Sequence, residues 1–152
     1  MTIKKLQKEV FEEIYQQVPR LCIEVIIDTP QGIILTKRLI SPWEGMWHIP
    51  GGTIYLGEKI DEALNRVADD EIGVQINIKN MVGTIEYLGQ HEKGFAHSVG
   101  IAFLCELKPG EQQKIRGSFQ GEEVEMFKTI PDNTIPEQKR FLERLEIGKY
   151  RY

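Results

Sequence analysis

The spacing of apolar residues along the chain predicts a mixture of helices and strands. Over residues 3–18 and 58–72 apolar side chains return every three or four positions, which is typical of amphipathic helices. Pro136 favours the first turn of a closing helix. β-Branched and apolar runs predict strands, the first two joined as a hairpin, at 21–27, 33–39, 74–88 (one or two strands), 98–107 and 123–128. Residues 40–52, with two Pro, three Gly and two Trp, predict a structured loop. No repeat interrupts this order, so we expect one domain of mixed α and β structure over residues 1–152.

The composition is that of an ordinary soluble domain, with 41% hydrophobic and 28% charged residues among 152. No apolar run reaches the roughly 18 residues of a membrane-spanning helix, and the first ten residues lack the apolar stretch of a signal peptide. Cys22 and Cys105 lie in apolar runs without metal-ligand spacing, which predicts buried thiols in a reducing compartment. We therefore expect a cytoplasmic protein that does not bind a membrane.

The net charge of −4 argues against binding to nucleic acid. Six acids and two bases fall within residues 58–73, so this one segment carries a charge equal to that of the whole chain. Such a run forms either a solvated helical face or a site for a cation. The composition alone does not choose between the two.

Helical geometry leaves both possibilities open, and the turn before the helix favours the cation site. At about 100° per residue, Glu71 lies within roughly 40° of Ile60, Leu64 and Val67, so a carboxylate continues the apolar stripe. A buried carboxylate is costly unless it is protonated, paired or bound to a metal. The alternative is an ion pair between Arg66 and Asp70, with Glu71 at the exposed end of the stripe. The preceding Pro-Gly-Gly turn at 50–52 allows backbone carbonyls to act as ligands, as Mg²⁺ or Mn²⁺ would require.

Residues 45–74 resemble the signature of the Nudix hydrolases. The approach Gly-x-Trp-x-x-Pro-Gly-Gly occupies 45–52, and the box follows over 52–74 with every spacing kept. The matching positions of the box are Gly52, Glu58, Arg66, Val67, Ala68, Asp70, Glu71, Gly73 and Val74. The resemblance implies an α/β/α sandwich with a mixed sheet, and hydrolysis of a nucleoside diphosphate linked to another moiety with Mg²⁺ or Mn²⁺ as cofactor.

Two positions depart from the signature. Val67 replaces the glutamate that follows the arginine, and Asp70 replaces the first glutamate of the pair. Fewer carboxylates imply fewer bound metals. Val67 also completes the apolar stripe, so we expect it in the core.

The weakened box is similar to that of the GDP-mannose mannosyl hydrolases, which cleave at the sugar carbon. That resemblance implies that Gly51, Glu71 and Gln120 hold the metal, that Glu24 and Arg38 contact the substrate, and that a homodimer forms through the N-terminal helix. It places His97 at the start of a strand, where substrate binding or strand capping suits it better than chemistry. The likeness then ends: Gly121 stands in place of the catalytic histidine, and Thr53 in place of a second arginine.

These considerations give one leading hypothesis and two alternatives. Asp70 joins Gly51 and Glu71 as a metal ligand, Arg66 positions the acids of the helix, and Glu122 or Glu123 deprotonates water. The leading substrate is a nucleotide sugar. The alternatives are a pyrophosphohydrolase that attacks phosphorus, and a nucleotide-binding domain that has lost catalysis.

Overall fold

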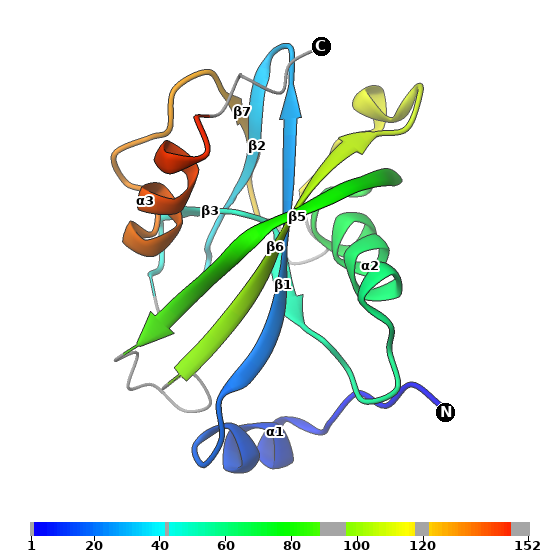
Figure 1. The fold of residues 1–152 in the computed structure, drawn as a ribbon, viewed down its shortest axis with the longest axis vertical. Coiled ribbons are helices and arrows are strands. Elements are labelled where there is room, and N and C mark those ends of the chain that lie inside the picture. The colour runs from blue at the N-terminus through cyan, green and yellow to red at the C-terminus, as the bar shows by residue number, and fades with distance from the viewer. Residues whose placement is uncertain (1, 42, 89–96, 118–121, 147–152) are drawn as a thin grey trace.

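The fold is a mixed β-sheet system with helices on both sides, seen in a computed structural model that describes residues 2–41, 43–88, 97–117 and 122–146 (Figure 1). One part of the sheet has the strand order β4-β1-β6-β5, and the other, formed by β2, β3 and β7, joins it where β2 pairs with β1. β1 and β6 run parallel, whereas the other pairs are antiparallel. The bounds of the strands are β1 Arg20–Thr29, β2 Gly32–Lys37, β3 Trp47–His48, β4 Gly51–Thr53, β5 Ile76–Leu88, β6 His97–Leu107 and β7 Val124–Phe127.

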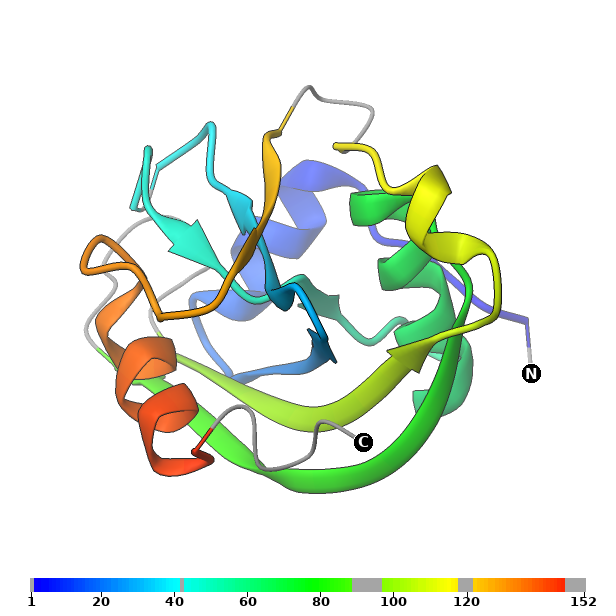
Figure 2. The ribbon, with the colours of Figure 1, turned by 90° about the horizontal axis from the view of Figure 1, so that it is seen from above.

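Alternate residues of β1 separate the two halves of the core. Ile23 and Val25 pack with the apolar face of α2, Ile60–Ile72, whereas Ile26 packs with Phe141 of α3, Pro136–Arg144. This alternation follows from the two-residue period of a strand that is covered on both faces. Figure 2 shows α2 and α3 on opposite sides of the curved β5–β6 layer. The predicted α/β/α sandwich with a mixed sheet is therefore confirmed.

Most predicted elements are present, with different ends. The β1–β2 hairpin is confirmed, and so is the α3 start at Pro136. The region 74–88, predicted as one or two strands, contains the single strand β5, whose pairing with β6 has two irregularities of register. A short 3₁₀-helix covers Glu111–Lys114. Val67, Cys22 and Cys105 are buried, as predicted.

Two predictions about local structure were wrong. The N-terminal helix α1 covers only Lys8–Tyr15, because the preceding residues are extended and the Lys4 N–H donates to the carbonyl of Leu56 at 3.0 Å. The segment 40–52, which we expected to be a loop, contains β3 and the start of β4. Strand pairing with β2 and β1 overrides the Gly- and Pro-rich composition of this segment.

Candidate active site at the end of the box helix

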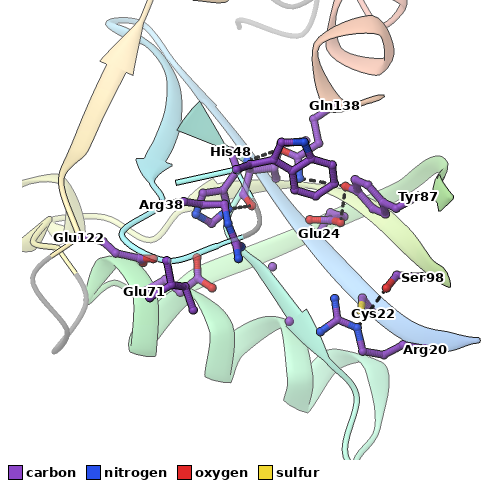
Figure 3. Close-up of a pocket in the computed structure, with 15 residues that line it drawn as sticks. Arg20, Cys22, Glu24, Arg38, His48, Glu71, Tyr87, Ser98, Glu122 and Gln138 are labelled. Atoms are coloured by element: carbon purple, nitrogen blue, oxygen red, sulfur yellow. Dashed lines mark hydrogen bonds between the residues drawn. The ribbon is translucent and has the colours of Figure 1, made fainter. Parts of the chain in front are cut away.

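A cleft opens where β4, the C-terminal end of α2 and the β1–β6 sheet meet (Figure 3). Glu71 and Glu122 point toward one another at one end, and Glu24, Tyr87 and Gln138 lie at the other. The remaining described residues of the lining are Arg20, Cys22, Arg38, Ile40, Trp43, His48, Ile49, Gly51, Gly52 and Ser98. The cleft therefore has an acidic end and a hydrogen-bonding end.

Glu71 is placed by α2 with one carboxylate oxygen unsatisfied. In the described part of the chain, Oε2 is shielded from solvent and has no hydrogen-bond partner. A backbone hydrogen bond from Gly51 reaches the carboxylate. Burial, together with the like charges of Glu122 and Glu24, raises the pKa of Glu71 well above its usual range. An enclosed carboxylate oxygen without a hydrogen-bond partner is costly, and a bound cation would compensate that cost.

The pairing of β4 with β1 turns the backbone of Gly51 toward the Glu71 carboxylate. Gly51 faces Glu24 in the antiparallel β1–β4 pair, and the neighbouring Val25 N–H donates to the Pro50 carbonyl at 2.8 Å. Hydrogen-bonded and non-hydrogen-bonded pairs alternate in such a ladder, so the N–H and C=O of Gly51 both point away from β1. The N–H meets Glu71, which leaves the carbonyl facing the same side.

His48 completes a group of possible metal ligands with Glu71 and Glu122. One ligand atom from each lies within 4.8 Å of the others. The His48 Nδ1 is 2.9 Å from the Ile49 carbonyl and therefore carries the proton, so Nε2 accepts from the Thr36 hydroxyl at 2.9 Å. Burial, and then the charge of Arg38, lowers the pKa of His48 to about 4. The ring is neutral at physiological pH.

This donor set fits a hard divalent cation. It offers the free Glu71 oxygen, the Glu122 carboxylate and the Gly51 carbonyl, which are the oxygen ligands that Mg²⁺ and Mn²⁺ prefer. The His48 lone pair is already used by Thr36. Asp70 is separate from this group: its side chain is 58% exposed and lies 3.9 Å from Arg66. Gln120 lies outside the described residues.

At the other end of the cleft, a chain of hydrogen bonds holds Glu24. The Tyr87 hydroxyl donates to Glu24 Oε1 at 2.7 Å, Gln138 Nε2 donates to that hydroxyl at 2.9 Å, and Gln138 Oε1 accepts from Ile49 N–H at 2.6 Å. A Cβ added at Gly51 or Gly100 would strike the Glu24 carboxyl, so both glycines are needed to admit it. Burial raises the pKa of Glu24 to about 8.

Arg66 acts on the helix and not on the cleft. Its guanidinium donates to both carboxylate oxygens of Glu58, at 2.6 and 3.0 Å, and to the Thr53 carbonyl at 2.9 Å. The Tyr55 ring lies 4.0 Å below it. The Glu58 carboxylate also accepts from the Tyr55 N–H, which ties the turn before α2 to the helix itself. The alternative to a cation site, an Arg66–Asp70 ion pair with an exposed Glu71, is therefore confirmed in its first part and wrong in its second. Asp70 pairs with Arg66, but the Glu71 carboxylate is shielded from solvent.

The other predicted site residues divide into two groups. Arg38 and Glu122 line the cleft. Glu123 has a side chain that is 58% exposed and lies 3.6 Å from Lys37, and His97 lies 3.4 Å from Glu86; neither is among the described residues of the cleft. His48 was not among the predicted site residues. In the structure it follows Trp47 in β3, and because Trp47 packs on Phe127, the side chain of His48 faces the opposite side of the strand.

The family is shown by a direct match. The family model for the NUDIX domain matches residues 18–145. The chain belongs to the NUDIX family. Agl8, a low-salt glycan biosynthesis protein of Haloferax volcanii, is 28% identical over 93% of this chain and 92% of its own length. An ADP-ribose pyrophosphatase of Methanocaldococcus jannaschii is 28% identical over 72% of this chain, which spans 62% of that relative.

Solved structures share the NUDIX fold. The MutT NUDIX hydrolase of Burkholderia pseudomallei has a TM-score of 0.73 at 21% identity, over 85% of this chain and 99% of that one. The NUDIX domain of Shewanella oneidensis NrtR, crystallised with ADP ribose, has a TM-score of 0.64 at 15% identity over 93% and 92%. The prediction of a NUDIX hydrolase is confirmed, whereas the domain bounds 1–152 stay a prediction. Among the described residues, no helix has the length and hydropathy needed to cross a membrane.

Proposed function

We propose that this NUDIX hydrolase cleaves a nucleoside diphosphate linked to another moiety, a nucleotide sugar in the leading case, with Mg²⁺ or Mn²⁺ bound at Glu71. The observation that carries the proposal is the Glu71 oxygen that has no partner among the described residues and lies beside the Gly51 backbone. The other end of the same cleft holds the hydrogen-bonded pair of Tyr87 and Glu24. One end of the cleft is suited to phosphate and metal, and the other to a base.

In this proposal Gly51 and Glu71 hold the cation, with Gln120 as a further predicted ligand. Asp70 was predicted as a ligand too, but its side chain lies beside Arg66 and outside the group around Glu71. The cation, when bound, neutralises the diphosphate and stabilises the negative charge that develops on it. Arg38 donates hydrogen bonds to the phosphate oxygens, which suits its planar fork of donors. Arg66 and Glu58 fix the helix that carries Glu71, so their role is positioning.

Glu122 is the proposed general base. Its carboxylate faces Glu71 at the mouth of the cleft, where it can accept a proton from the attacking water. Glu123 is the weaker candidate because Lys37 pairs with it outside the cleft. His97 stays a predicted substrate contact beside Glu86.

Glu24 is the proposed contact to the base. Its Oε1 already accepts from Tyr87, so Oε2 meets the ligand, as an acceptor when ionised and as a donor when protonated. Trp43, with its ring centre 6.0 Å from that of Tyr87, offers an aromatic face beside this group.

Three observations bear on which bond is cleaved. The similarity to Agl8 runs the length of the chain and favours a sugar-linked substrate, whereas the ADP-ribose pyrophosphatase relative favours attack at phosphorus. A pyrophosphohydrolase is therefore the second candidate. Val67, buried where the family carries a glutamate, favours carbon attack because the helix then offers one acid fewer.

The test is a panel of nucleotide sugars and dinucleotides turned over in ¹⁸O-labelled water with Mg²⁺. Label in the free sugar supports cleavage at carbon, and label in the phosphate product supports the second candidate. Binding of a nucleotide sugar without turnover of any compound would reject both enzymatic proposals. A cytoplasmic location and a homodimer stay predictions.

A further inference from the structure

A second cavity adjoins the cleft at β4, whose residues Gly51 and Gly52 line both. It has a volume of about 630 Å³ and is walled by the N-terminal segment on one side and by the turn before α2 on the other. Figure 1 shows the N-terminal segment passing beside the loop that joins β4 to α2. The Lys4 N–H bond to the Leu56 carbonyl fastens the two walls together. This volume is within the range of small-molecule sites, about 300–1,000 Å³.

The cavity and the cleft share a wall at the proposed metal site. Gly51, Gly52 and Glu71 line both of them. A diphosphate held at Glu71 would therefore have one substituent directed into the cleft and the other into the cavity. The cleft already contains the hydrogen-bonding group around Glu24, so the cavity is available to the second substituent.

The lining of the cavity combines apolar side chains with lysines. Leu6, Phe11, Ile14 and Tyr15 come from the N-terminal segment, and Tyr55 comes from the opposite wall. Lys4, Lys5 and Lys8 also line it, on the wall across from Asp70 and Glu71. Ring faces pack against such apolar and aromatic side chains, and ammonium groups donate to hydroxyl or phosphate oxygens.

The helix that forms this wall contributes nothing to the core. α1 has no buried residue, and Ile14, which lines the cavity, is 38% exposed. The hydrophobic face of an amphipathic helix is ordinarily buried against its own protein. Here that face borders a cavity that touches the proposed metal site, which gives it a ligand-binding use.

We propose that the N-terminal segment builds the pocket for the ring-bearing group attached to the distal phosphate of the substrate, while the base occupies the cleft. The inference rests on the proposed function, since it assumes a diphosphate at Glu71. The ring is the sugar of a nucleotide sugar or the second nucleoside of a dinucleotide. Both present a ring with apolar faces and hydrogen-bonding edges.

The test fills the cavity without touching the catalytic end. Ile14→Trp places a large side chain in the cavity, and Val10→Trp makes the same change on the same helix at a residue outside the lining. For the full chain with Mg²⁺, calorimetry measures binding of a nucleoside diphosphate hexose, a dinucleoside diphosphate and the bare nucleoside diphosphate. KM is measured for whichever compound is turned over.

We expect Ile14→Trp to weaken binding of a ring-bearing compound about tenfold, a change of about 1.4 kcal/mol, and to leave the bare diphosphate within about twofold. Val10→Trp should change neither. Weakening of the hexose compound alone identifies a sugar pocket, and weakening of the dinucleotide alone identifies a nucleoside pocket. An equal effect on the bare diphosphate, or no effect on any compound, overturns the proposal. If no compound is turned over but Ile14→Trp still weakens binding of the ring-bearing compounds alone, the proposed hydrolase activity is rejected and the proposed pocket is supported.

Discussion

Two glutamates of the box, Glu58 and Glu71, stand in opposite electrostatic situations at the two ends of one segment. The Glu58 side chain is 2% exposed but accepts hydrogen bonds from Arg66 and from the Tyr55 N–H. Arg66 holds the pKa of Glu58 below its usual range. Glu71 is enclosed, its Oε2 has no hydrogen-bond partner among the residues that the structure describes, and its pKa is raised.

Under the proposed function, this difference separates a structural acid, Glu58, from a functional acid, Glu71. A buried carboxylate whose hydrogen bonds are satisfied stabilises the fold, whereas one that is left unsatisfied costs free energy unless it is protonated or a ligand compensates it. The two residues have the same side chain, so substitutions of the same kind compare them directly.

The largest effect is expected for Glu71→Gln. The change removes the charge and keeps the shape, so activity should fall at least about 100-fold, beyond the 10–100-fold typical of residues that only orient a metal ligand. Steady-state kinetics with Mg²⁺ measures it, with Asp69→Asn, an exposed acid on the same helix, as the control. Full activity of Glu71→Gln would show that Glu71 is not needed for catalysis.

The next effect concerns Glu122, the acid that faces Glu71. Glu122→Gln should lower kcat by about 100-fold, at the low end of the range for a general base. Its neighbour Glu123 is exposed and paired with Lys37, so Glu123→Gln should change kcat by less than about twofold. Equal losses in both variants would show that the loop, and not the facing carboxylate, is what matters.

Glu58→Gln should act mainly on stability. Loss of charge-assisted hydrogen bonds with Arg66 should lower the free energy of unfolding by about 2 kcal/mol, and activity should fall by about tenfold through misplacement of α2. Urea unfolding without metal provides the measurement. Glu71→Gln should keep or raise the free energy of unfolding in the same experiment. If Glu71→Gln lowered it as much as Glu58→Gln, both glutamates would be structural.

The smallest effect is a pH dependence at the other end of the cleft. The pKa of Glu24 rises from 4.5 to about 8 on folding, so the folded state binds more protons and stability is lost as pH rises through this window. Between pH 5 and 8 the free energy of unfolding of the unsubstituted chain should fall. In Glu24→Gln it should fall by about 1 kcal/mol less, or by a still smaller amount, because the variant has no titrating carboxyl. Chemical unfolding across that range tests the sign, with Glu123→Gln as the control. A slope identical to that of the unsubstituted chain would show that Glu24 is ionised in the folded protein.

The sequence predicted the fold better than the site. The helical spacing of apolar residues and the turn residues predicted α2, α3 and the β1–β2 hairpin. They could do so because the local propensity of these segments and the burial of their side chains favour the same structure. The helical angle of Glu71 correctly indicated a carboxylate on the buried face. Ile60 was wrong in that stripe, because it begins the helix and is 41% exposed.

The rest depends on contacts between distant segments. Tyr87 and Gln138 join Glu24 only when β5 and α3 pack around β1, and their side chains carry no local signal of that role. The short α1 follows from pairing of Lys4 with Leu56, which no window of sequence around Lys4 contains. His48 became visible as a cleft residue only once β3 was known to be a strand.

The central claim is that Glu71 and the Gly51 carbonyl share a divalent cation, and anomalous diffraction from a crystal soaked in Mn²⁺ tests it most directly. The account predicts a peak within about 2.0–2.4 Å of both a Glu71 oxygen and the Gly51 carbonyl oxygen, with Glu122 beside it. A Glu71 carboxylate that is instead paired with Arg38, in density without a manganese peak, would contradict it.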